Sequence, residues 1–233
     1  MNDSAPPTGF PVYASGHTDS SRAVIVLQEA FGVNGHIRNV ADRFADEGYL
    51  AVAPQLFHRD GSPEIPYDDL PSAMTFMANL NKQGITNDLN ATTDFLATLG
   101  FGASNIAAVG YCMGGTVAFF AATLGTIGAT ASFYGGGVAT GRFGLPPLLE
   151  LAADLKSPWL GLYGDLDQSI PVDQIEALRE ATDAAPVATE IVRYAAGKHG
   201  FHCDARPDAY NEAGARDAHA RVLAFFAEHL SDK

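Results

Sequence analysis

The stretch Val109-Gly-Tyr-Cys112-Met-Gly-Gly115 decides the fold of this chain. It follows a short apolar run, 106–109, which predicts a strand, and it precedes Thr116-Val-Ala-Phe-Phe-Ala-Ala, which predicts a helix. One glycine stands two residues before Cys112 and another stands two residues after it, which is the spacing G-x-nucleophile-x-G with cysteine as the nucleophile. In this motif the nucleophile lies on a sharp turn between the strand and the helix. Neighbouring backbone comes too close for side chains at the two glycine positions. Free N–H groups at the helix N-terminus would favour a thiolate and a developing oxyanion.

Length and composition limit what the chain can be. Its 233 residues, 47% hydrophobic and 18% charged, predict one globular domain over residues 1–233. A net charge of −13 argues against nucleic acid or an anionic membrane as a partner, and no apolar run approaches the roughly 20 residues of a membrane span. Residues 1–7 lack the basic and apolar regions of a signal peptide, and two cysteines fit a reducing compartment, so we expect a cytoplasmic protein.

Strand-like and helix-like segments alternate along the chain. Short β-branched or apolar runs predict strands at 23–28, 49–54, 106–109, 129–134, 159–163 and 190–194. Apolar residues at helical spacing predict helices at 36–47, 71–81, 85–99, 116–122, 173–182 and 209–230, and loops rich in glycine or proline cover 57–71 and 135–147. This alternation predicts an α/β fold with a mostly parallel, doubly wound sheet and helices on both faces. We find no internal repeat and no domain linker.

Candidate catalytic residues follow the strands, at the carboxyl edge where ligands bind in such sheets. Asp165 and Asp167 come after the strand at 159–163, and His199 comes after the strand at 190–194. The chain order is therefore nucleophile, acid, histidine, as in the α/β-hydrolase fold. A carboxylate on one ring nitrogen would fix the histidine tautomer. Asp167 is favoured for this role because Ile-Pro and a helix follow it, and Asp165 is expected to cap or brace the turn.

Each of these residues also has a purely structural interpretation. A free cysteine is usually a small buried hydrophobe, which the glycines around Cys112 make less favoured. Glu29, at the end of a strand, could be a capping or loop carboxylate. His202 and Cys203 could join His199 as metal ligands, but their spacing matches none of the usual zinc patterns. We therefore expect no metal and no cofactor.

Several signatures together make the chain resemble the dienelactone hydrolase family over nearly its whole length. They are Gln28-Glu29-Ala30-Phe31-Gly32-Val33-Asn34, Gly110-Tyr-Cys112-Met-Gly-Gly, Asp167 with Pro171, and His199-Gly-Phe201. The resemblance implies an α/β-hydrolase fold and hydrolysis of an enol-lactone or related ester through a thioester intermediate. It also implies that Glu29 touches the resting thiol and takes its proton when substrate binds. The backbone N–H groups of Ala30 and Met113 would form the oxyanion hole.

The arginines that would bind a substrate carboxylate differ from the family pattern. Family members that act on dienelactone hold its carboxylate with two arginines, one of them just beyond the histidine. This chain has no arginine between Asp60 and Leu99, has Cys203 four residues after His199, and reaches its next arginine only at Arg206. We therefore expect a small-molecule ester or lactone that need not be dienelactone. Tyr134 and Phe201 are candidate substrate contacts, although a core or rim aromatic is an equal interpretation of Tyr134.

Two other classes of function stay open at this point. The protein could be a thioesterase or acyl transferase that acts on larger acyl groups. It could also be a non-catalytic member of the fold that uses its cysteine for redox signalling or binding. The sequence is compatible with a monomer or a small homo-oligomer.

Overall fold

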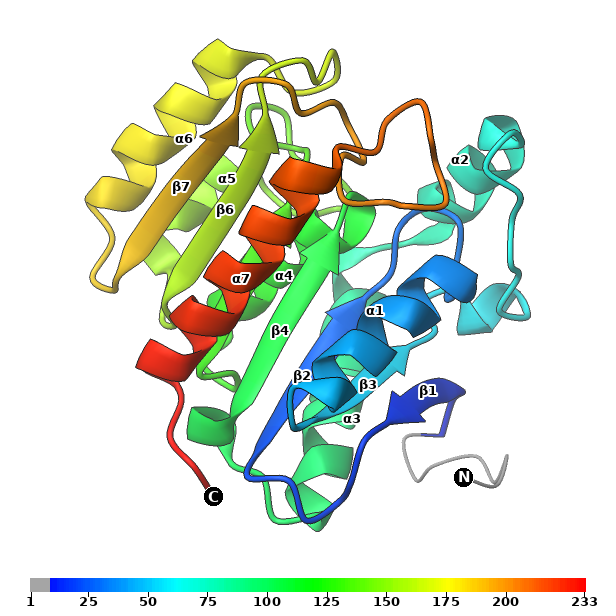
Figure 1. Ribbon diagram of the computed structural model, residues 1–233, viewed down its shortest axis with the longest axis vertical. Helices are drawn as coiled ribbons and strands as arrows, with labels where there is room; N and C mark the ends of the chain where they lie inside the picture. The colour runs from blue at the N-terminus through cyan, green and yellow to red at the C-terminus, as the bar shows by residue number, and fades with distance from the viewer. Residues whose placement is uncertain (1–8) are drawn as a thin grey trace.

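A seven-stranded sheet forms the centre of the computed structural model, which describes residues 9–233 (Figure 1). The strand order is β1-β3-β2-β4-β5-β6-β7, and every neighbouring pair is parallel except β1 with β3. The predicted mostly parallel sheet is thus confirmed. The strands are β1 (Val12–Ser15), β2 (Arg22–Leu27), β3 (Tyr49–Pro54), β4 (Ile106–Tyr111), β5 (Ala129–Phe133), β6 (Trp159–Gly164) and β7 (Thr189–Tyr194).

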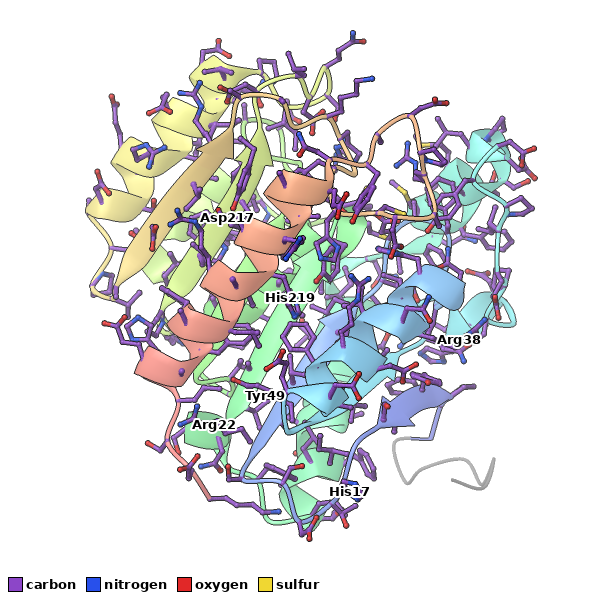
Figure 2. All side chains as sticks on the ribbon, in the orientation of Figure 1. His17, Arg22, Arg38, Tyr49, Asp217 and His219 are labelled. Carbon is purple, nitrogen blue, oxygen red and sulfur yellow. The ribbon has the colours of Figure 1, made fainter. Side chains whose placement is uncertain are left out.

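Helices cover both faces of the sheet, as the alternating pattern predicts (Figure 1). In the view of Figure 1, α1 and α7 lie in front of the sheet, and α3 and α4 lie behind it. His219 on α7 packs against Phe44 on α1 with ring centroids 5.0 Å apart, and Figure 2 shows His219 between these two helices. The helices are α1 (Gly35–Asp46), α2 (Leu70–Asn79), α3 (Lys82–Thr98), α4 (Met113–Ala122), α5 (Leu148–Leu151), α6 (Val172–Asp183) and α7 (Glu212–His229), with short 3-10 turns at His58–Asp60, Ala103–Asn105 and Ala152–Asp154.

The amino and carboxyl ends of the parallel strands differ in the residues that follow or precede them. Arg22 and Tyr49 are register partners at the start of β2 and β3, at the lower edge of Figure 2. From these amino ends the parallel strands cross the core to their carboxyl ends. All residues of β3, β4, β5 and β6 are buried. Apolar strands covered on both faces are the expected form of a parallel sheet. The residues with candidate chemistry follow the carboxyl ends.

The structure differs from the predicted elements in a few places. β1 was not predicted, because a half-buried four-residue edge strand has no continuous apolar run. α4 begins at Met113 rather than at 116, since Gly114 and Gly115 are poor helix formers that packing holds in the first turn. The short α5 after the second glycine-rich loop was also missed.

Two expectations from sequence concern location. Residues 1–7, whose composition supports the cytoplasmic expectation, lie outside the described residues. Within residues 9–233, none of the helices combines the length and the apolar character needed to span a bilayer.

The turn at Cys112 joins β4 to α4 in a strained conformation. Cys112 has φ 54° and ψ −113°, a backbone region that residues with a Cβ rarely adopt. A Cβ at Gly110 would lie 1.9 Å from the carbonyl oxygen of Gly114, and a Cβ at Gly114 would lie 2.2 Å from that of Leu27. The Gly114 N–H also donates to the Gln28 carbonyl at 3.0 Å. Both glycines are therefore required by backbone contact.

We expect Gly114→Ala to lower the free energy of unfolding by about 3 kcal/mol, because the new methyl group must push backbone atoms apart. The matched control is Gly35→Ala at the exposed start of α1, where an added Cβ meets no atom within 4 Å. That change should be neutral or stabilise by up to about 1 kcal/mol. Urea unfolding followed by circular dichroism measures both, and equal midpoints for the two variants would contradict the packing described.

Candidate active site

Three side chains meet beyond the carboxyl ends of β4, β6 and β7, whose arrowheads point to the same edge of the sheet (Figure 1). Cys112 follows β4, Asp167 follows β6 and His199 follows β7. His199 Nε2 lies 3.1 Å from Cys112 Sγ, and His199 Nδ1 lies 2.7 Å from Asp167 Oδ2. The imidazole thus bridges a thiol and a carboxylate, and the Ser169 hydroxyl oxygen also lies 3.2 Å from Nδ1.

Asp167 is fixed from its other side by Ser169. The Ser169 N–H and hydroxyl both donate to Asp167 Oδ1, at 2.8 and 2.6 Å. Asp167 is 5% exposed, so these hydrogen bonds replace water on a buried carboxylate. Asp165, the competing aspartate, instead forms an ion pair with Arg193 on β7 at 2.7 Å. The structure therefore places Asp167, and not Asp165, beside His199.

The charges in this group favour a protonated imidazole. Partial burial lowers the pKa of His199. The neighbouring Cys112 and the hydrogen bond to Asp167 raise it by more, so that the net pKa is about 10. For Asp167, burial raises the pKa of the carboxyl group. The hydrogen bonds with His199 and Ser169 lower it by more, so the net shift of this pKa is downward. The raised pKa of His199 and the lowered pKa of Asp167 favour an imidazolium paired with a carboxylate.

Two backbone N–H groups that the resemblance assigns to the site have no acceptor within residues 9–233. Neither Ala30 nor Met113 donates a backbone hydrogen bond to any acceptor within residues 9–233. Met113 is the first residue of α4, where N–H groups have no partner inside the helix and the helix dipole is positive. Ala30 is 3% exposed and follows Glu29 in the loop after β2. The oxyanion hole that the resemblance implies at these two donors stays a prediction.

Glu29 lies in the same region but contacts other partners. Its carboxylate accepts hydrogen bonds from the Tyr134 hydroxyl at 3.1 Å and the Tyr67 hydroxyl at 3.4 Å, and the residue is 1% exposed. Burial, and after it the charge of Glu29, raise the pKa of both phenols, so they remain protonated donors. Within residues 9–233 Glu29 has no hydrogen bond to Cys112, whose thiol is directed to His199.

The two predicted substrate contacts are both fully buried. Tyr134 has φ 41° and its ring centroid lies 5.1 Å from that of His199. Its hydroxyl is used by Glu29, so Tyr134 reaches the site as a hydrogen-bond donor as well as an aromatic wall. Phe201 packs behind Tyr134, with ring centroids 5.6 Å apart, and is 0% exposed. Whether either residue contacts substrate stays a prediction.

The sequence reasoning missed Tyr67 and Ser169. Tyr67 lies in the acidic loop 57–71, and no local pattern there distinguishes it from any other loop aromatic. Ser169 had a usable signal, because an aspartate whose side chain accepts from the N–H two residues later is a common turn motif. Asp167-Gln-Ser169 could therefore have been identified as such a turn.

Comparison with known proteins finds one family over nearly the whole chain. The family model described as the dienelactone hydrolase family matches residues 10–230. A Salmonella typhimurium protein provisionally named carboxymethylenebutenolidase is 37% identical over 213 residues, covering 90% of this chain and 78% of that protein. A similarly named Synechocystis protein is 35% identical, covering 89% and 86%.

Solved structures give the same result. A crystal structure from Klebsiella pneumoniae, provisionally named a dienelactone hydrolase, superposes with a TM-score of 0.87 at 34% identity and covers 97% of both chains. The matched residues span the sheet and every site residue described above. The chain therefore belongs to the dienelactone hydrolase family, a family of enzymes that hydrolyse lactones or esters.

Proposed function

We propose that this hydrolase cleaves carboxylic esters or lactones through a thioester on Cys112, with His199 and Asp167 as its catalytic partners. The observation that carries the proposal is the chain of contacts from Sγ to Nε2 at 3.1 Å and from Nδ1 to the Asp167 carboxylate at 2.7 Å. These are hydrogen-bond distances between a nucleophile, a base and the group that orients the base. The strained turn leaves Cys112 half-buried beyond the carboxyl end of β4.

The reaction divides into two steps. Cys112 thiolate attacks the carbonyl carbon and forms a C–S bond, and collapse of the tetrahedral intermediate breaks the C–O bond while His199 gives its proton to the leaving alkoxide. Neutral His199 then takes a proton from water as that water attacks the thioester. The C–S bond breaks, the acid is released, and the imidazolium and thiolate are restored. Asp167 keeps Nδ1–H in place throughout and stabilises the imidazolium.

The surrounding groups support both steps. The N–H groups of Ala30 and Met113 would hold the oxyanion, where removal of one such donor typically costs about 10²-fold to 10³-fold in rate. For Glu29 we propose the role that the resemblance implies, a proton acceptor for the resting thiol. The phenols of Tyr67 and Tyr134 support this role by holding its carboxylate.

The substrate is proposed to be a small ester or lactone. The relatives' names refer to a lactone, dienelactone, whose carboxylate would need a cation. Arg59 is held by Asp88 at 2.7 and 2.8 Å, whereas Arg206 lies with its guanidinium carbon 5.7 Å from the Tyr67 ring centroid. We place the enzyme in the cytoplasm, where its two free thiols stay reduced, as a monomer or small homo-oligomer.

Cys112→Ala should lower kcat/KM for p-nitrophenyl acetate and for a dienelactone by at least about 10³-fold, because no other group can form the acyl-enzyme. Mass spectrometry of the wild-type enzyme quenched during turnover should show one acyl adduct on the peptide that contains Cys112. An adduct on another peptide, or full activity without the thiol, would contradict the proposal.

Asp167→Asn should lower kcat/KM by about 10²-fold to 10⁴-fold, because the amide cannot stabilise the imidazolium and favours the wrong tautomer. Asp165→Asn is the matched control, two residues away on the same turn, where the carboxylate pairs with Arg193. It should keep activity within about twofold. Steady-state kinetics on both variants decide the assignment, and a larger loss at Asp165 would reverse it.

The His199 imidazolium should persist through neutral pH and titrate near pH 10, as its raised pKa requires. Since this pKa lies above the ordinary 6.5, the group contributes stability that is fully present below pH 6.5 and is lost as the pH rises to about 10. Asp167→Asn should lower the titration midpoint. Nitrogen-15 NMR of the histidine rings from pH 5 to pH 11 measures this, and a neutral His199 ring at pH 7 in the wild-type enzyme would be inconsistent with the ion pair.

A further inference from the structure

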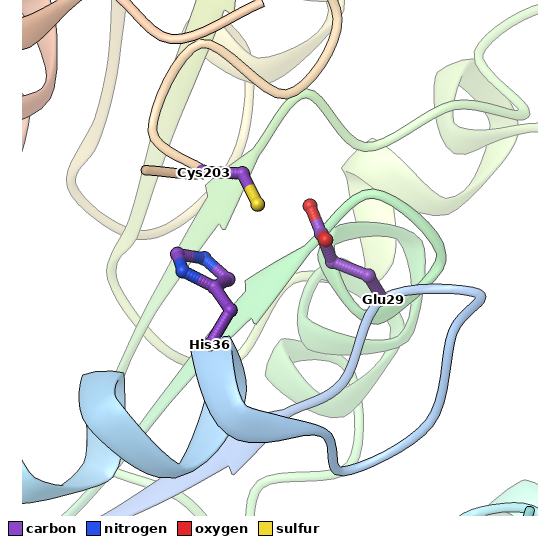
Figure 3. A group of neighbouring side chains, drawn as sticks. All are labelled: Glu29, His36 and Cys203. Carbon is purple, nitrogen blue, oxygen red and sulfur yellow. The ribbon is translucent and has the colours of Figure 1, made fainter. Parts of the chain in front are cut away.

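A second cluster of reactive side chains lies beside the hydrolytic site. Figure 3 shows Glu29, His36 and Cys203 directed toward one another from the loop after β2, the first turn of α1 and the segment before α7. One donor atom from each residue lies within 4.8 Å of the other two. Their exposures are 1%, 3% and 0%, so the donors share a site closed to bulk water. The hydrolytic mechanism above uses neither His36 nor Cys203.

One ring nitrogen of His36 contacts a carboxylate, and the other has no partner within residues 9–233. Its Nδ1 lies 2.9 Å from the Asp204 Oδ1, and a carboxylate there accepts a hydrogen bond from Nδ1–H. A neutral ring in this tautomer carries its lone pair on Nε2. That atom is fully buried and has no hydrogen-bond partner within residues 9–233. A histidine that donates one ring N–H to a carboxylate and leaves the other nitrogen free is the usual arrangement around metal-binding imidazoles.

Glu29 and Cys203 leave acceptor capacity toward the same point. Each Glu29 oxygen accepts one phenolic hydrogen bond, and a carboxylate offers about four lone-pair sites in total. Within the described part of the chain, Glu29 forms no ion pair, although a buried carboxylate normally needs one. Cys203 donates its thiol hydrogen to the Tyr67 hydroxyl at 3.3 Å. Burial, and after it the charge of Glu29, raise the pKa of this thiol to about 12.

We propose that Glu29, His36 and Cys203 bind a divalent transition-metal ion of the zinc type. The donor set of carboxylate oxygen, imidazole nitrogen and thiolate sulfur suits zinc, whereas magnesium and calcium prefer oxygen ligands alone. One carboxylate and one thiolate supply two negative charges, which a divalent ion neutralises in a buried site. Asp204 would orient His36, and Tyr67 and Tyr134 would orient Glu29.

The geometry requires a modest closure. Zinc bonds of about 2.0–2.3 Å place tetrahedral ligand atoms roughly 3.5 Å apart, so donors up to 4.8 Å apart must approach by about 1 Å. Three protein ligands leave a fourth position for water.

Cobalt(II) provides the test, because a cobalt–thiolate bond gives a charge-transfer absorption that identifies sulfur as a ligand. Chelator-treated wild-type protein should bind one cobalt ion with this absorption, and one equivalent of zinc should abolish it. Cys203→Ala should lose the absorption and weaken zinc binding by at least about 100-fold, and Asp204→Asn should weaken it by about 10-fold to 100-fold. Cys112→Ala, which removes the other cysteine, should keep both the absorption and the 1:1 stoichiometry.

Several outcomes would overturn the proposal. These are no cobalt absorption at millimolar metal, loss of the absorption in Cys112→Ala with retention in Cys203→Ala, or competition by magnesium as effective as that by zinc. Thermal unfolding of each metal-free variant checks folding, and His36→Gln provides a second ligand variant if Cys203→Ala does not fold. Because the readout is metal binding, failure of this site would leave the proposed hydrolysis untouched.

Discussion

The close approach of backbone at the turn between β4 and α4 is the constraint on which the rest of the site depends. Gly110 and Gly114 let the carbonyls of Leu27 and Gly114 lie where side chains would otherwise be. The same approach lets the Gly114 N–H bond to the Gln28 carbonyl, which fixes the end of β2 against the start of α4. Glu29 and Ala30 follow directly, so the turn positions the thiol, one of the two proposed oxyanion donors and the buried carboxylate together.

The carboxyl edge of the sheet then determines which charges can meet. Because β4, β6 and β7 are parallel and near one another in the sheet, residues far apart in sequence come to one place. Two aspartates follow β6, but their environments differ. Asp165 faces Arg193 on β7 and forms a structural ion pair, while Asp167 turns inward, where Ser169 and His199 replace its water. A two-residue difference along one turn thus separates a brace from a candidate catalytic group.

Sequence patterns predict the strands and helices of this molecule well and its tertiary contacts poorly. The six parallel strands end within about two residues of the predicted positions, since each is a short β-branched or apolar run, and β3, β4, β5 and β6 are buried throughout. β1 escapes because an edge strand is only half buried. Glu29, Cys112, Asp167 and His199 can be singled out because a motif or a strand end marks each. Tyr67 and His36 cannot, because their importance comes from segments that only the folded chain brings to Glu29.

Glu29 connects the two proposed sites through one electrostatic requirement. A carboxylate that is 1% exposed gains little from water, and two phenols stabilise it only by hydrogen bonding. A proton or a metal cation can supply the missing positive charge. The proton is the one the hydrolytic site is proposed to give up from Cys112, and the cation is the one His36 and Cys203 would hold. The Cys112 proton and the metal ion would bind the same Glu29 carboxylate. A bound zinc ion would therefore compete with proton transfer from Cys112 to Glu29. If both proposals are correct, zinc therefore inhibits hydrolysis through Cys203, and loss of that thiol relieves the inhibition without removing the nucleophile.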